Sequence, residues 1–91
     1  DKRMEIVLDG NVIENKELLF ETLKKQINSD EFYGNNLDSL WDVLSNYTDD
    51  LTITVMHSAE LVENLGNYAH MLMGLFDELN QIYTEVVLNI T

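Results

Sequence analysis

Two aspartates, Asp38 and Asp42, stand four residues apart in a stretch whose leucines follow helical spacing. Side chains at positions i and i+4 of a helix lie on one face, one turn apart, and like charges there are mildly destabilising. This pair therefore indicates a use beyond stability. Trp41 lies beside the charged face, and aromatic residues next to carboxylates are typical of the energetic centre of a protein interface. The competing interpretation is that Trp41 belongs to the core and the aspartates to a solvated face.

Residue types that support catalysis are sparse in this chain. The histidines are His57 and His70, thirteen residues apart, a spacing outside the ligand patterns of zinc sites. The four glycines stand singly, so no glycine-rich phosphate loop is predicted. An aspartate pair can bind Mg²⁺, but such sites usually also hold substrate phosphates, which this acidic chain repels. We therefore predict that the protein is not an enzyme and that it has no catalytic residue, metal or cofactor.

The tripeptide Asp38-Ser39-Leu40 leaves a second function open. A small acidic protein with Asp-Ser-Leu at the start of a helix resembles an acyl carrier protein, whose serine receives a phosphopantetheine arm. Carrier proteins are all-helical bundles, whereas residues 51–56 and 86–90 carry strand patterns. An acyl carrier-like protein with Ser39 as the phosphopantetheine site is therefore the alternative.

Acidity is the dominant bulk property of the chain. Seventeen acids against five bases give a net charge of −12, and all five bases lie within the first 25 residues. Residues 26–91 carry eleven carboxylates and no Lys or Arg. Nucleic acid and anionic membranes are held through cations on the protein, so neither is a predicted partner. A negative surface instead steers a basic protein toward it.

Hydrophobic periodicity predicts strands that alternate with helices. The predicted strands are 4–8, 51–55 and 86–90, and the predicted helices are 15–27, 36–44, 58–65 and a longer one from residue 67. Strands separated by helical segments imply crossover connections and a parallel sheet. No repeat, proline or linker interrupts the 91 residues. We therefore predict a single α/β domain, residues 1–91, with a three-stranded parallel sheet and helices packed against it.

Caps and apolar faces refine this prediction. Asn36 is placed to cap the central helix, and Ser58 to cap the third. In the central helix, Leu37, Leu40 and Leu44 are predicted to point inward. In the last helix the predicted inward face consists of Tyr68, Leu72, Leu75, Leu79 and Ile82.

The expected compartment follows from three absences in the sequence. The chain has no Cys, no apolar run as long as a membrane span, and no recognisable secretory signal. We therefore expect a cytoplasmic protein.

The run 33–44, YGNNLDSLWDVL, resembles the signature of the barstar family, intracellular inhibitors of secreted bacterial ribonucleases of the barnase type. The core Tyr-Gly-x-Asn-Leu-Asp-x-Leu-Trp-Asp matches at every specified position. The resemblance extends over the whole chain in length and element order. It implies a barstar-like fold and a one-to-one complex with a small basic ribonuclease, whose active site the helix and its preceding loop plug.

The resemblance also implies individual roles. Asp42 takes the place of the substrate phosphate among the catalytic cations of the enzyme, and Asp38 pairs with another base. The full predicted partner-binding set is Phe32, Tyr33, Asn36, Leu37, Asp38, Trp41, Asp42, Asn46, Tyr47 and Glu78. Phe32 stands where the family has a second Tyr, Asn46 and Tyr47 replace a Gly-Trp pair, Val43 replaces a Cys, and Ile82 replaces a further acidic contact. These departures leave the identity of the target ribonuclease open.

Overall fold

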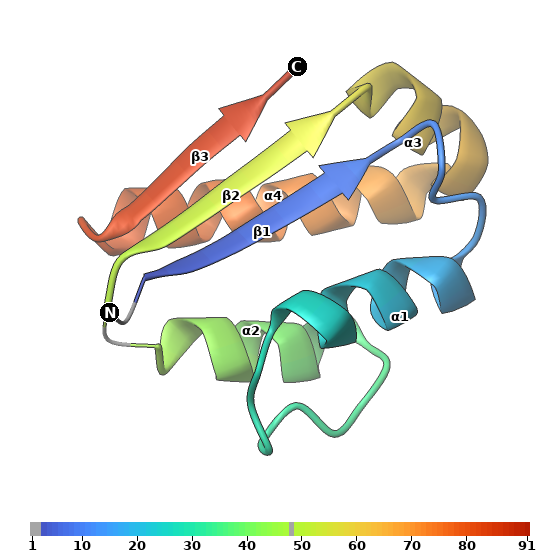
Figure 1. The fold of residues 1–91 in the computed structure, drawn as a ribbon. Coiled ribbons are helices and arrows are strands. Elements are labelled where there is room, and N and C mark those ends of the chain that lie inside the picture. The colour runs from blue at the N-terminus through green and yellow to red at the C-terminus, as the bar shows by residue number, and fades with distance from the viewer. Residues whose placement is uncertain (1–2, 48) are drawn as a thin grey trace.

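The computed structural model describes residues 3–47 and 49–91; Asp1, Lys2 and Thr48 lie outside the described residues. Its elements are β1 (Met4–Asp9), α1 (Lys16–Gln26), α2 (Leu37–Ser45), β2 (Leu51–Met56), α3 (Ser58–Leu65), α4 (Asn67–Ile82) and β3 (Val86–Ile90), shown in Figure 1. Each predicted strand and helix is present with nearly the predicted bounds.

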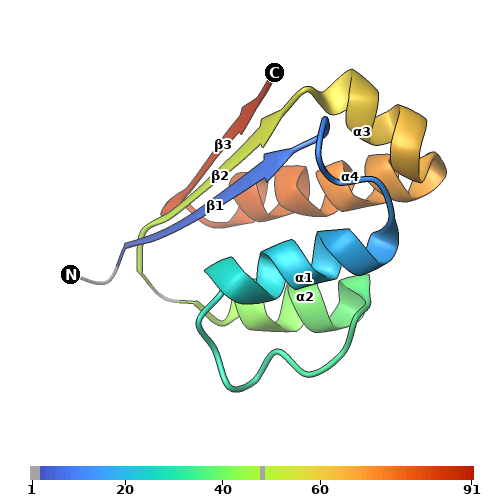
Figure 2. The ribbon, with the colours of Figure 1, turned by 45° about the vertical axis from the view of Figure 1, so that its right-hand side comes forward.

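The three strands form one parallel sheet in the order β1-β2-β3, which confirms the predicted architecture. Met4 aligns with Leu51 across the first pair, and Leu51 aligns with Val86 across the second. The connection from β1 to β2 and the connection from β2 to β3 both move in the same direction across the sheet. Because crossover connections between parallel strands are right-handed, both connections place their helices on the same face of the sheet. Figure 2 shows the helices on one side of the sheet, with α3 beyond the carboxyl ends of the strands.

The core lies between the sheet and this layer of helices. Alternate strand residues point toward the helices, as the period of two requires. The buried side chains include Ile6 and Leu8 of β1, Leu51, Ile53 and Val55 of β2, Leu19, Phe20 and Leu23 of α1, Leu40, Val43 and Leu44 of α2, and Ala69, Leu72, Phe76 and Leu79 of α4. One continuous cluster thus supports both α2 and α4.

The buried face of α4 differs in part from the predicted one. Leu72 and Leu79 are buried as predicted, but Phe76 occupies the position between them, and Ile82 is 53% exposed. The residues facing the sheet form a narrow stripe, and Leu75 is rotated out of it and is half-buried. No helix within residues 3–47 and 49–91 combines the length and the apolarity needed to cross a membrane.

The start of α3 also differs from the prediction. The cap position belongs to His57, in the left-handed region with φ 54°, and it makes no side-chain capping bond. Ser58 instead donates its hydroxyl hydrogen bond to the Thr91 carbonyl at 2.9 Å. The prediction that Ser58 caps this helix was therefore wrong, because the hydroxyl is used to hold the end of β3.

Gln26 ties the last turn of α1 to the edge of the sheet. Its Nε2 donates to the Val7 carbonyl at 2.8 Å, and its Oε1 accepts from the Val7 N–H at 2.7 Å. This pair of bonds satisfies backbone groups that an edge strand leaves unpaired. It also fixes the point from which residues 27–36 leave for the candidate site.

Candidate protein-binding site

Helix α2 is short, and capping bonds at both ends hold its shape. Asn36 Oδ1 accepts a hydrogen bond from the Ser39 N–H at 2.8 Å, which confirms the predicted N-cap. At the other end, Asn46 Nδ2 donates to the Asp42 carbonyl at 2.7 Å. The buried side chains of this helix are Leu40, Val43 and Leu44. Such capping matters because a helix of nine residues is marginal by itself.

The loop before α2 is anchored by Lys24 of α1. Its Nζ donates to the Tyr33 carbonyl at 3.1 Å and lies 5.0 Å from the centroid of the Phe32 ring. The Phe32 ring is only 7% exposed and meets Phe20 edge to face at a centroid distance of 6.3 Å. Tyr33 is 81% exposed. The structure therefore places Phe32 in the core, away from the exposed partner-binding surface predicted for it, and presents Tyr33 to solvent.

Gly34 lets the loop pass directly against the first turn of α2. A Cβ atom built on Gly34 would lie 2.4 Å from Ser39 Oγ and 2.7 Å from Asn36 Nδ2. Any side chain here would push against both the N-cap residue and Ser39. The glycine backbone thus partly covers the half-buried Ser39, the residue that the carrier-protein alternative would modify. The fold around Ser39 is an α/β sandwich, whereas carrier proteins are helical bundles.

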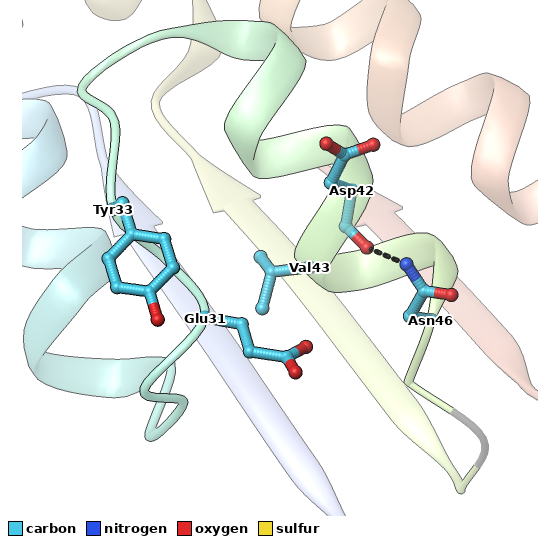
Figure 3. Close-up of a pocket in the computed structure, with 5 residues that line it drawn as sticks. All are labelled: Glu31, Tyr33, Asp42, Val43 and Asn46. Atoms are coloured by element: carbon cyan, nitrogen blue, oxygen red, sulfur yellow. Dashed lines mark hydrogen bonds between the residues drawn. The ribbon is translucent and has the colours of Figure 1, made fainter.

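One concavity lies between α2 and the loop, with a volume of about 510 Å³. It is lined by Glu31 and Tyr33 of the loop and by Asp42, Val43 and Asn46. Figure 3 shows the loop residues on one side and the helix residues on the other, with the Asn46 amide bonded to the Asp42 carbonyl. The bond uses the backbone oxygen of Asp42, so the carboxylate remains available.

The second concavity lies on the other side of α2, against α4, with a volume of about 370 Å³. Its lining consists of Leu37, Asp38 and Trp41 from α2 and Met71, Gly74, Leu75 and Glu78 from α4. Helix α2 is therefore a ridge between two hollows. Asp42 borders one hollow and Asp38 the other, with the half-buried Trp41 on the same side as Asp38.

Four exposed carboxylates surround this ridge without neutralising partners. Within the described residues, the side chains of Glu31, Asp38, Asp42 and Glu78 make no hydrogen bond or ion pair. The ion pair that Lys25 forms joins Glu21 on α1, at 3.4 Å. The carboxylates are thus presented to solvent and are free to receive cations from a partner. No three His, Cys, Asp or Glu side chains of the described ranges are grouped so as to hold a metal ion.

Asp9 and His57 form a pair far from this site, at the carboxyl ends of the strands. Asp9 Oδ1 accepts from the Asn11 N–H at 2.9 Å, and His57 Nδ1 lies 2.9 Å from the same oxygen. The Asn11 hydrogen bond, followed by the one with His57, holds the pKa of Asp9 below its usual value of 3.8. This pair joins β1 to the start of α3, so its role is in the scaffold.

Seven of the ten predicted site residues line the two concavities, namely Tyr33, Leu37, Asp38, Trp41, Asp42, Asn46 and Glu78. Of the others, Phe32 is buried, Asn36 is exposed and caps α2, and Tyr47 packs half-buried against the core. Sequence reasoning missed Glu31, Val43, Met71, Gly74 and Leu75 as lining residues. A signal for Glu31 was available, since this acid lies two residues before Tyr33 in the anchored loop.

A capped helix with unpaired carboxylates, apolar hollows and an exposed tyrosine defines the class of this molecule. It is an acidic α/β protein whose capped helix exposes carboxylates beside apolar hollows, a composition typical of protein-recognition surfaces.

Comparison with known proteins gives the particular family. Residues 3–90 match the family described as Barstar (barnase inhibitor). The chain is also 34% identical, over 77 residues, to a Bacillus subtilis (strain 168) protein named "Putative ribonuclease inhibitor YrdF". That alignment covers 84% of this chain and 85% of the relative. The chain therefore belongs to the barstar family, as the resemblance of residues 33–44 predicted.

Proposed function

We propose that this protein inhibits a small basic ribonuclease of the barnase type by forming a one-to-one complex that closes its active site. The observation that carries the proposal is the set of unpaired carboxylates on and beside α2: Glu31, Asp38, Asp42 and Glu78. The family supports a ribonuclease as the target class. The proposed place of action is the cytoplasm of the cell that makes the nuclease.

Charge mimicry is the proposed basis of recognition. A ribonuclease gathers cationic side chains to hold the phosphodiester, so its cleft is a preformed receptor for carboxylates. Asp42 is exposed and borders the concavity shared with Glu31 and Tyr33. In the proposed complex Asp42 occupies the phosphate position, Asp38 and Glu78 meet flanking cations, and Tyr33 covers the cleft. Inhibition then requires no chemical step.

Rigidity of the acidic surface makes this mimicry effective. The caps at Asn36 and Asn46, the buried leucines of α2 and the Lys24–Tyr33 bond hold the backbone of α2 and of the preceding loop in place before binding. A preorganised surface loses less conformational entropy on association than a mobile one. The remaining apolar lining excludes water around the charge pairs, which strengthens them.

Titration of the protein into a panel of small basic microbial ribonucleases tests the proposal. With at least one enzyme, RNA cleavage should fall linearly and reach zero at one equivalent of inhibitor. Calorimetry or size-exclusion chromatography with light scattering should give the mass of a one-to-one complex. Undiminished cleavage by every member of the panel at a large excess of the protein would refute the proposal.

A further inference from the structure

Gly74 occupies a position where neither the backbone nor the packing of this protein requires glycine. It lies in the middle of α4 (Asn67–Ile82), and the glycine with positive φ is Gly66, outside that helix. A Cβ atom built on Gly74 meets no atom within 4 Å apart from its chain neighbours and the nearby backbone of its own helix. Glycine inside an exposed helix is less stable than alanine, because it loses more backbone freedom on folding. A Cβ atom here, as in alanine, would thus stabilise α4 without a steric clash.

The open space above Gly74 belongs to the concavity between α2 and α4. Apolar groups form its walls: Trp41 from α2 and Met71 and Leu75 from α4, with Met71 52% exposed. Asp38 and Glu78 stand in the same lining without ion-pair partners among the described residues. The missing side chain at position 74 therefore leaves room in an otherwise apolar hollow that carries two negative charges.

We propose that Gly74 is a specificity-determining residue, whose lack of a side chain admits an apolar-bodied side chain of the target ribonuclease into this hollow. The inference rests on the proposed function. The occupant is assigned to the ribonuclease because the hollow shares α2 with Asp42 and is therefore continuous with the proposed interface. Its carboxylates also match a basic surface around a catalytic cleft. Among ribonucleases whose clefts all bind Asp42, the size of residue 74 then determines which ones the protein binds tightly.

Two substitutions of different size test this role. Gly74→Ala and Gly74→Leu should both raise the melting temperature, by about 2–8 °C, because each is a better helix former that enters open space. Gly74→Leu fills the hollow and should weaken inhibition of the ribonuclease that the parent protein binds most tightly by at least about tenfold. Gly74→Ala should cause a smaller loss. The control is Ala59→Leu, which adds bulk at an exposed position of α3, away from both hollows, and should inhibit like the parent.

Inhibition constants are measured against several ribonucleases, because a change in stability alone would not alter the order in which the enzymes are bound. Asp42→Ala should weaken inhibition of every enzyme, whereas Gly74→Leu should change the order in which the enzymes are bound. If Gly74→Leu is folded and keeps the inhibition constants of the parent for all enzymes, the inference is overturned while the proposed function stands. If the parent protein itself inhibits no ribonuclease, the proposed function fails and the inference falls with it.

Discussion

Replacing Asp42 by alanine should separate stability from inhibition in this molecule. The carboxylate is exposed and has no partner among the described residues, so its removal breaks no bond to any of them. It also relieves the repulsion from Asp38 one turn earlier, worth about 0.2–0.5 kcal/mol. Alanine is the better helix former, by up to about 0.7 kcal/mol. The variant should therefore unfold at the same temperature as the parent or a few degrees higher.

The effect of the same change on binding should be large and opposite in sign. In the proposed complex Asp42 is buried against several cations, and truncation leaves those charges unpaired in a desolvated cleft. Losing one partner of such a buried charge pair costs about 2–5 kcal/mol, which corresponds to about 30- to 5000-fold in affinity. Asp42→Asn keeps the shape and loses the charge, so its loss should be nearly as great.

Inhibition titrations and thermal melts of three variants measure both effects. Asp42→Ala and Asp42→Asn are compared with Glu60→Ala, which removes an exposed acid from α3, outside both concavities. The control should inhibit within about twofold of the parent, because a distant charge contributes only to steering. A folded Asp42→Ala that inhibits as well as the parent would refute the active-site plug.

Three further predictions concern the loop, the charge and the scaffold. Lys24→Ala removes the hydrogen bond to the Tyr33 carbonyl, so inhibition should weaken about three- to tenfold. The free energy of unfolding should fall by at most about 1 kcal/mol. An unchanged inhibition constant would show that the loop needs no anchor. Raising the ionic strength should lower the association rate steeply and change the dissociation rate much less, as measured by stopped flow; an association rate independent of salt would contradict electrostatic steering. Hydrogen bonds from Asn11 and His57 lower the pKa of Asp9 in the folded state below its usual value of 3.8. They therefore stabilise the protein above that pH, and this stabilisation is lost as the pH falls through the lowered pKa of the folded state. The melting-temperature advantage of the parent over Asp9→Asn should thus be full near pH 6 and shrink below about pH 4, and an advantage that grows on acidification would contradict this assignment.

The elements of the fold were predictable because each carries a local signal that agrees with its tertiary role. The alternation in residues 51–55 corresponds to the face that β2 buries. In α2, Leu40 and Leu44 are buried as predicted, but Leu37 is only half-buried and Val43 is buried in addition. Ser58 could not be assigned correctly, since its hydroxyl binds the carbonyl of Thr91, a residue distant in the sequence. For the same reason the inward face of α4 was predicted only in part. Which stripe of that helix meets the sheet depends on how the helix packs, and so Phe76 is buried while Ile82 is exposed.

The candidate site also contains residues that could be predicted from the sequence and residues that only the fold brings to it. Residues of the continuous run 33–44 were found because their types and spacing lie together in the sequence. Glu31 and Gly74 enter the site through three-dimensional proximity, one from a loop folded back over α2 and the other from α4. Phe32 shows the opposite case. The resemblance to the barstar family predicted a partner contact for Phe32, but its ring packs edge to face on Phe20 and lies in the core.

Competition with a nucleotide tests most directly whether the acidic surface occupies the catalytic cleft. The measurement is the affinity of the protein for an inhibited ribonuclease at increasing concentrations of a nucleoside 3′-phosphate that binds the enzyme's active site. If Asp42 takes the phosphate position, the apparent Kd should rise in proportion to the nucleotide concentration above the Kd of the nucleotide. Asp42→Ala should bind weakly and show a smaller dependence on the nucleotide. An affinity that stays constant while the cleft is saturated with nucleotide would contradict the account, because the protein would then be binding elsewhere on the enzyme.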